Sequence, residues 1–214
     1  MQAAAEELLA LEPDGLQLTP GNAPSPDFVG WLASTGVPAR THHGFHPGAL
    51  RQAVWSAEGN CLVAVDSVHP PREANDDMAE RWLERAAAGG AGGVALETMY
   101  PGYALGTGRA LERAMALGVR LAVDVAHLAI QRTLGVLSDA TWGRLQGYCK
   151  IDEVHVSESA GARDAHLGLR PDSFGLGWAR ERLAAGTPVV CECYLHRSTP
   201  PERRAPLGLL RGRR

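Results

Sequence analysis

The chain has 214 residues, of which 45% are hydrophobic and 21% are charged, and its formal net charge is −3. This composition is typical of a globular protein and excludes a disordered chain, and the length fits a single domain with a substantial core. A slightly negative chain has no overall positive field to attract nucleic acid or an anionic membrane. We therefore expect neither as a partner.

The N-terminal segment and the cysteines favour a cytoplasmic protein. Residues 1–15 carry no basic stretch before an apolar run, so they do not resemble a secretory signal, and no segment is apolar enough for a membrane span. The cysteines show neither zinc-knuckle nor C-x-x-C spacing. They are Cys61, Cys149, Cys191 and Cys193. We expect reduced thiols in a cytoplasmic protein.

Short apolar runs alternate with helical stretches along the whole chain, which predicts strand–helix units around a parallel sheet. In chain order we predict a helix at 3–13, a strand at 15–20, a helix at 26–35, a strand at 39–45, a helix at 48–57, a strand at 61–70, a helix at 77–89, a strand at 92–99, a helix at 108–118, a strand at 119–127, a helix at 138–148, a strand at 151–158, a helix at 173–186 and a strand at 188–194. Ser138 is the predicted N-cap of its helix.

This alternation predicts a TIM-type (β/α) barrel with seven strands instead of the usual eight. The simplest explanation is that the strand before the first helix is missing. Residues 1–200 form the predicted barrel domain, and the Arg-rich segment 201–214 is predicted to be a solvated tail. An unsealed sheet edge promotes association, so we expect a homodimer or a protein partner.

Nitrogen and oxygen donors stand near the ends of most predicted strands. They are His43, His69, Glu97, Asp124, His127, His155 and Glu192, followed in the loop after His155 by Asp164 and His166. In a parallel barrel the C-terminal ends of the strands meet at one face, where function collects. We therefore expect these side chains to converge.

The carboxylates carry the argument for a metal, because any one histidine alone is better explained as a hydrogen-bonded strand residue. Glu97, Asp124 and Glu192 each lie in an apolar run that should be buried. A bare buried carboxylate costs several kcal/mol unless it is paired or bound to a metal. Only Arg40 and Arg120 lie on predicted strands, which is too few to pair these carboxylates. Shared cations would neutralise them together.

The types of donor atom limit which metals the site could bind. Imidazole and carboxylate without thiolate suit iron, zinc or manganese. The donors exceed what one ion needs, so we expect two or three divalent ions, with iron first and positions left open for substrate or water.

At these residues, from about Leu8 to Arg197, the chain resembles the xylose isomerase-like TIM-barrel superfamily, also called the AP endonuclease family 2 fold. The resemblance implies that the predicted strand 15–20 corresponds to the second strand of that fold. The sugar isomerases and epimerases of the superfamily hold one metal on a set that matches Glu97, Asp124, His155 and Glu192. Their two glutamates also act in proton transfer, and we assign Glu97, Glu192 and Asp124 as catalytic residues.

Endonuclease IV-type enzymes add further ligands that this chain matches with His43, His69, Asp124-x-x-His127 and Asp164-x-His166. Multinuclear non-haem iron enzymes that oxidise peptides use the same plan. His42 competes with His43, since adjacent strand residues face opposite sides. The superfamily pattern of His followed by a small residue favours His43.

Four functions remain open at this point. Oxidation of a small molecule or peptide at a multi-iron centre agrees best with the full donor set. Sugar isomerisation or epimerisation needs only one metal, and phosphoester hydrolysis needs a clustered site but not a DNA clamp. A non-catalytic binding protein is the fourth. We predict that Arg163 and Arg197 hold an anionic part of the substrate.

Overall fold

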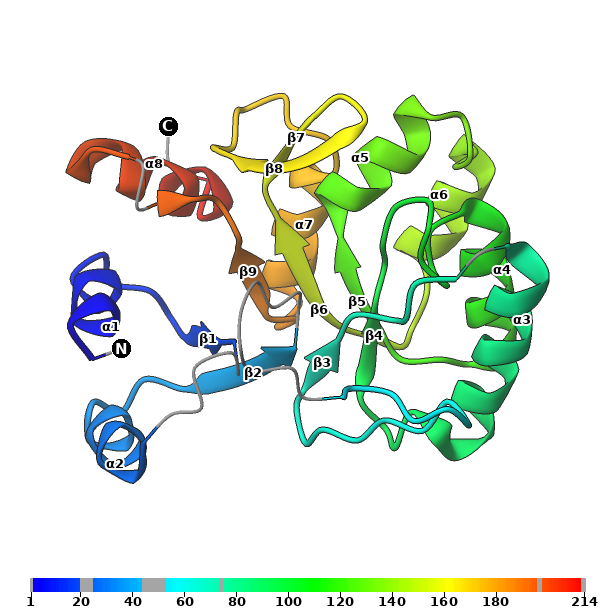
Figure 1. Cartoon of the computed structure of the whole chain (residues 1–214). Helices are drawn as coiled ribbons and strands as arrows, with labels where there is room; N and C mark the ends of the chain where they lie inside the picture. Colours follow the sequence, from blue (N-terminus) through cyan, green and yellow to red (C-terminus); the bar gives the residue numbers. More distant parts are fainter. Residues whose placement is uncertain (1, 20–24, 44–52, 74, 196–197, 213–214) are drawn as a thin grey trace.

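Seven parallel strands form one sheet that curves into a nearly closed barrel in the computed structural model (Figure 1). The structure describes residues 2–19, 25–43, 53–73, 75–195 and 198–212. The strands are β1 (Leu16–Leu18), β2 (Ala39–His43), β3 (Ser67–Val68), β4 (Ala95–Glu97), β5 (Leu121–Asp124), β6 (Ile151–Val156) and β9 (Val189–Cys191), paired in that order. The predicted α/β class and the seven parallel strands are confirmed, and the architecture is consistent with a TIM-like barrel.

Helices surround this sheet and cover its outer side (Figure 1). They are α1 (Gln2–Leu9), α2 (Pro26–Ser34), α3 (Asp76–Arg85), α4 (Gly108–Leu117), α5 (Val125–Thr133), α6 (Asp139–Gln146), α7 (Leu176–Ala184) and α8 (Pro200–Leu210), with a π-helical turn η1 (Ala86–Gly90) after α3. Ser138 caps α6 as predicted, since its hydroxyl accepts a hydrogen bond from the backbone N–H of Thr141 at 3.0 Å. No helix in the described part of the chain is long and apolar enough to cross a membrane.

The main core lies between the central strands and their helices. Leu96, Leu121, Val123 and Val154 of the strands are fully buried. Burial on both faces is what a parallel sheet requires, and it explains why these strands are continuous apolar runs in the sequence. A carboxylate in such a run therefore points into the barrel or into the apolar layer outside it.

The region before β3 differs from the prediction of a helix at 48–57 and a strand at 61–70. Residues 53–57 are not helical, and residues 44–52 lie outside the described part. Trp55 forms an antiparallel bridge with Cys61, and its ring packs on Trp82 with ring centroids 4.9 Å apart. The apolar residues that predicted a long strand therefore support this bridge, and β3 itself is short.

The predicted solvated tail is wrong, because most of the segment forms α8. Thr199 and Glu202 form a capping box at its start, and Leu210 at its end is buried in the core. Arg203 lies 3.1 Å from Glu7 of the N-terminal helix α1. The arginines were interpreted as solvated charges, but Arg203 and Arg211 pair with Glu7 and Asp14 and so connect α8 to the N-terminal segment.

Candidate metal centre

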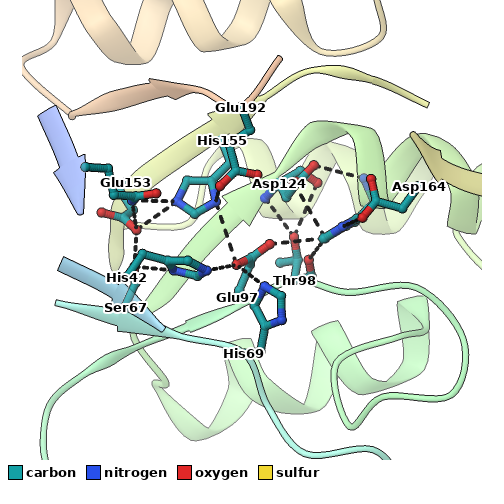
Figure 2. Close-up of polar contacts among 12 residues, drawn as sticks. His42, Ser67, His69, Glu97, Thr98, Asp124, Glu153, His155, Asp164 and Glu192 are labelled. Atoms are coloured by element: carbon teal, nitrogen blue, oxygen red, sulfur yellow. Dashed lines mark hydrogen bonds and ion pairs between the residues drawn. The ribbon is translucent and has the colours of Figure 1, made fainter. Parts of the chain in front are cut away.

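The candidate ligands lie at or just beyond the C-terminal ends of neighbouring strands (Figure 2). Glu97 ends β4, Asp124 ends β5, and His155 lies one residue before the end of β6. His69 directly follows β3, and Glu192 directly follows β9. The parallel sheet brings these ends to one face of the barrel, as expected.

Glu97 lies at the middle of the cluster and is almost fully buried. Its Oε2 is 3.1 Å from His42 Nε2, 3.0 Å from His69 Nε2 and 3.7 Å from His155 Nδ1. Its Oε1 is 3.2 Å from His127 Nδ1. One carboxylate therefore has imidazoles from several strands around both of its oxygens.

A second group surrounds His155. His155 Nδ1 lies 3.2 Å from Glu192 Oε1. One ligand atom from each of Glu97, Asp124, His155 and Glu192 lies within 4.8 Å of the others, a group able to hold one ion. Asp124 also caps α5, because its Oδ1 accepts a hydrogen bond from the backbone N–H of His127 at 3.0 Å. Its other oxygen, Oδ2, has no hydrogen-bond partner within the described residues.

The third group comes from α5 and from a hairpin formed by β7 (Glu158–Ala160) and β8 (Arg163–Leu167). Asp164 Oδ2 lies 3.3 Å from His127 Nε2 and 3.3 Å from His166 Nε2. His127 Nδ1 lies 2.8 Å from the carbonyl oxygen of Thr98, an acceptor that leaves Nε2 free to face Asp164. His166 has a left-handed φ of 44°, which is uncommon for a residue other than glycine. Such strain is frequent at functional sites.

Burial and neighbouring charge shift the pKa values of Glu97 and Asp124 in different directions. Burial alone would raise the pKa of Glu97, but the facing imidazoles, His69 first, hold that pKa well below its ordinary value. Burial raises the pKa of Asp124 to about 6. The carboxylates are thus not equivalent, and Glu97 is the one most strongly held in its anionic form.

The pKa values of two buried imidazoles are raised. Burial would lower the pKa of both His127 and His155, but facing carboxylates raise both values well above the ordinary one. Asp124 has the largest effect on His127, and Glu192 has the largest on His155. These imidazoles therefore lie where positive charge is favoured, which is where a cation would bind.

Whether these residues fit a cation can be judged from buried nitrogen and oxygen atoms that have no hydrogen-bond partner. Atoms without a hydrogen-bond partner in the described part include both oxygens of Glu97, Oδ2 of Asp124, Nδ1 of His155, Oδ1 of Asp164 and Nδ1 of His166. A cation held at about 2.1 Å by tetrahedral ligands separates those ligands by about 3.4 Å. The nitrogen–oxygen separations around Oε2 of Glu97, 3.0–3.7 Å, agree with that spacing. The donor set fits divalent cations.

The strand arginines do not neutralise these carboxylates. Arg40 pairs with Glu153 at 2.7 Å, and Arg120 pairs with Asp152 at 2.6 Å. Neither arginine pairs with Glu97. The cost of burying the central carboxylate is therefore offset by imidazoles, and by any cation that they share with it.

The structure corrects the choice of His43. The other predicted donors make contacts in the cluster, and on β2 His42 contacts Glu97. Arg40 and His42 both reach interior carboxylates, so strand alternation places His43 on the opposite face. Burial does not distinguish the two histidines, which are 3% and 4% exposed.

Sequence reasoning missed Glu153. This residue is fully buried on β6 and contacts both His155 and Arg40. Its position two residues before His155 was the available signal, because residues i and i+2 of a strand share a face.

The two arginines proposed to bind substrate remain predictions. Arg163 is exposed at the start of β8, and Arg197 lies outside the described residues. Two tyrosines that were not predicted lie near the histidines instead. Tyr100 has its ring centroid 5.1 Å from that of His127, and Tyr103 lies 6.4 Å from His69 by the same measure.

Neither the known family models nor the curated proteins include a match to this chain. The resemblance to the xylose isomerase-like superfamily therefore stays a prediction.

Proposed function

We propose that this protein is an enzyme that binds two or three divalent cations and oxidises a small molecule or a peptide at non-haem iron. The observation that carries the proposal is the position of Glu97. Both of its oxygens face imidazoles, and it belongs both to the group with His42 and His69 and to the group with Asp124, His155 and Glu192. A carboxylate shared by two ligand groups is the arrangement expected of a bridging ligand.

The ligand types support iron, zinc or manganese. Cys191 and Cys193 flank Glu192 in the sequence, but both pack against the hydrophobic core, and neither belongs to a group of described residues able to hold a metal. Within the described residues no thiolate contacts Glu97, and imidazole with carboxylate is the ligand chemistry of non-haem iron. The superfamily resemblance favours iron over the other two metals.

The residues of the chain supply binding and orientation. Glu97 would hold the ions together, while Glu192 and Asp124 would hold one of them from the β5–β9 side. Asp124 is itself fixed by its bond to the start of α5, so its Oδ2, which accepts no hydrogen bond from the described residues, has a defined direction. Bound iron would supply the electron transfer that no side chain here provides.

Metal analysis of the protein purified without added metal tests the proposal. Two or three equivalents of metal, with iron predominant, are expected. Oxygen consumption by the iron-loaded protein should then depend on an added peptide or small-molecule substrate. Less than one equivalent of any metal after reconstitution with iron, zinc and manganese would refute the function.

Sugar isomerisation or epimerisation is a second candidate, favoured by one specific observation. The group of Glu97, Asp124, His155 and Glu192 is compact enough to hold a single ion without the remaining histidines. A sugar isomerase or epimerase should bind one equivalent of metal and convert simple sugars under anaerobic conditions. The metal count therefore separates the two candidates before any substrate is known.

A further inference from the structure

Glu153 is a fully buried carboxylate that lies beside the candidate centre but outside the predicted ligand set (Figure 2). It accepts hydrogen bonds from Arg40 Nε at 2.7 Å, from His155 Nε2 at 2.8 Å and from the hydroxyl of Ser67. Gln17 Nε2 also donates to it at 3.3 Å. Each of these partners comes from a different strand.

The partners of Glu153 determine which ring nitrogen of His155 carries the hydrogen. Arg40 keeps its proton under all ordinary conditions and favours the ionised form of the carboxylate. An ionised carboxylate only accepts hydrogen bonds, so Nε2 of His155 must carry the hydrogen. Nδ1 of His155 is then the nitrogen that faces Glu192 Oε1 at 3.2 Å.

The same reasoning extends through Ser67 to His42. The single hydroxyl proton of Ser67 is donated to Glu153. The oxygen of Ser67 can then only accept from Nδ1 of His42, which lies 2.9 Å away. Nδ1 of His42 therefore carries the hydrogen, and Nε2 faces Glu97 Oε2 at 3.1 Å.

We infer that Glu153 is a positioning residue that orients His42 and His155 so that each presents an unprotonated ring nitrogen to the metal centre. It reaches His155 directly and His42 through Ser67. The inference rests on the proposed metal site, since binding a cation is what requires those two lone pairs.

A direct ligand role for Glu153 is the competing interpretation. One of its oxygens lies within 4.8 Å of ring nitrogens of both His42 and His155. However, a carboxylate offers about four acceptor positions. Oε1 already accepts hydrogen bonds from Ser67, His155 and Gln17, which occupies both positions of that oxygen, and Oε2 accepts one from Arg40. The adjacent guanidinium would also repel a cation.

The test uses the full chain loaded with zinc, which is diamagnetic, and nitrogen-15 NMR of the histidine rings. The wild type should show slowly exchanging ring N–H signals at Nε2 of His155 and Nδ1 of His42, assigned with His42→Gln and His155→Gln. Glu153→Leu should remove the slow exchange of both signals and weaken zinc binding about ten- to a hundredfold. Ser67→Ala keeps the pair of Glu153 with Arg40 and should change only the His42 signal.

Asp152→Asn is the matched control, because it removes the neighbouring ion pair of Asp152 on β6 with Arg120, and neither of these residues is a candidate ligand. It should leave both ring signals and the zinc affinity unchanged. Wild-type affinity and both slow signals in Glu153→Leu would overturn the positioning role, and so would loss of a complete zinc equivalent, which would make Glu153 a ligand. A wild type that binds no zinc, iron or manganese would instead refute the proposed function along with this inference.

Discussion

Glu97 concentrates the electrostatic problem of the site in one side chain. It is 1% exposed, no arginine in the described part of the chain pairs with it, and four histidines approach it. Removing one partner of a buried charged group costs more than the interaction itself contributes, because the other partner is left uncompensated. Substitutions at this position should therefore affect the whole centre.

Glu97→Gln should abolish binding of at least one metal equivalent. The amide keeps the shape of the side chain but removes the charge and one of the two ligand oxygens that a bridge needs. Metal analysis after reconstitution with iron or zinc measures the loss. A variant that keeps full metal content and activity would contradict the bridging role.

His42 and His43 form a matched pair of adjacent buried histidines. His42→Gln should lower metal affinity on the order of a hundredfold or more, beyond what loss of an outer partner costs. His43→Gln should leave the affinity within a few-fold of the wild type, because its side chain faces away from Glu97. Chelator competition on both variants is the measurement, and equal effects would contradict the assignment of His42.

The residues of the site were predictable to different degrees. Glu97, Asp124 and Glu192 could be found because a carboxylate in an apolar strand demands a partner. The facing of His42 and His43 depends on which residues of β2 point inward, and the sequence motif carries no information about that. Arg40 lies two residues before His42 and therefore on the same face of β2. Its partner Glu153 lies more than a hundred residues away along the chain, so the sequence did not indicate which face points inward.

At the scale of elements, the β7–β8 hairpin brings part of the site to the barrel from outside the main sheet. Asp164 and His166 lie on β8, and the backbone N–H of Tyr194 donates to the carbonyl oxygen of His166 at 2.9 Å. The hairpin is thereby fixed to the segment that follows Glu192. A ligand group on a separate element should be separable from the rest.

His166→Ala should remove one metal ion and leave the ion held by Glu97, Asp124, His155 and Glu192. Only Asp164 and His127 of the third group would remain, too few for a stable site. Metal analysis should show a decrease of one equivalent. Simultaneous loss of all metal would show that the ions are not bound independently.

Elements with a start signal of their own were predicted better than elements that continue the pattern of a neighbour. The helix α6 was found because Ser138, a residue typical of an N-cap, directly precedes a stretch with helical apolar periodicity. The helix α5 was missed, since Asp124 ends β5 and caps α5 at once, and the apolar residues after it continue the strand pattern. The hairpin was missed because its residues lie on a surface with no apolar face to produce alternation.

At the scale of the molecule, the candidate centre connects strands that are otherwise joined only to their neighbours. Its residues come from β2, β4, β5 and β6 and from the segments after β3 and β9. Both edges of the sheet, β1 and β9, lack a further paired strand within the described residues. The folded barrel assembles these ligands, so metal binding and folding should be coupled.

Chelation should therefore lower the melting temperature. A ligand present at 100 times its dissociation constant stabilises the folded state by about 2.7 kcal/mol. For a chain of this size each kcal/mol corresponds to about 2–4 °C, so removal of metal should lower the melting temperature by about 5–10 °C. Calorimetry with and without chelator measures the shift, and Glu97→Gln is the control, since a protein that has already lost metal should respond less. An unchanged melting temperature in a fully loaded wild type would mean that the barrel holds its shape without the ions, and that the imidazoles alone offset the burial of Glu97.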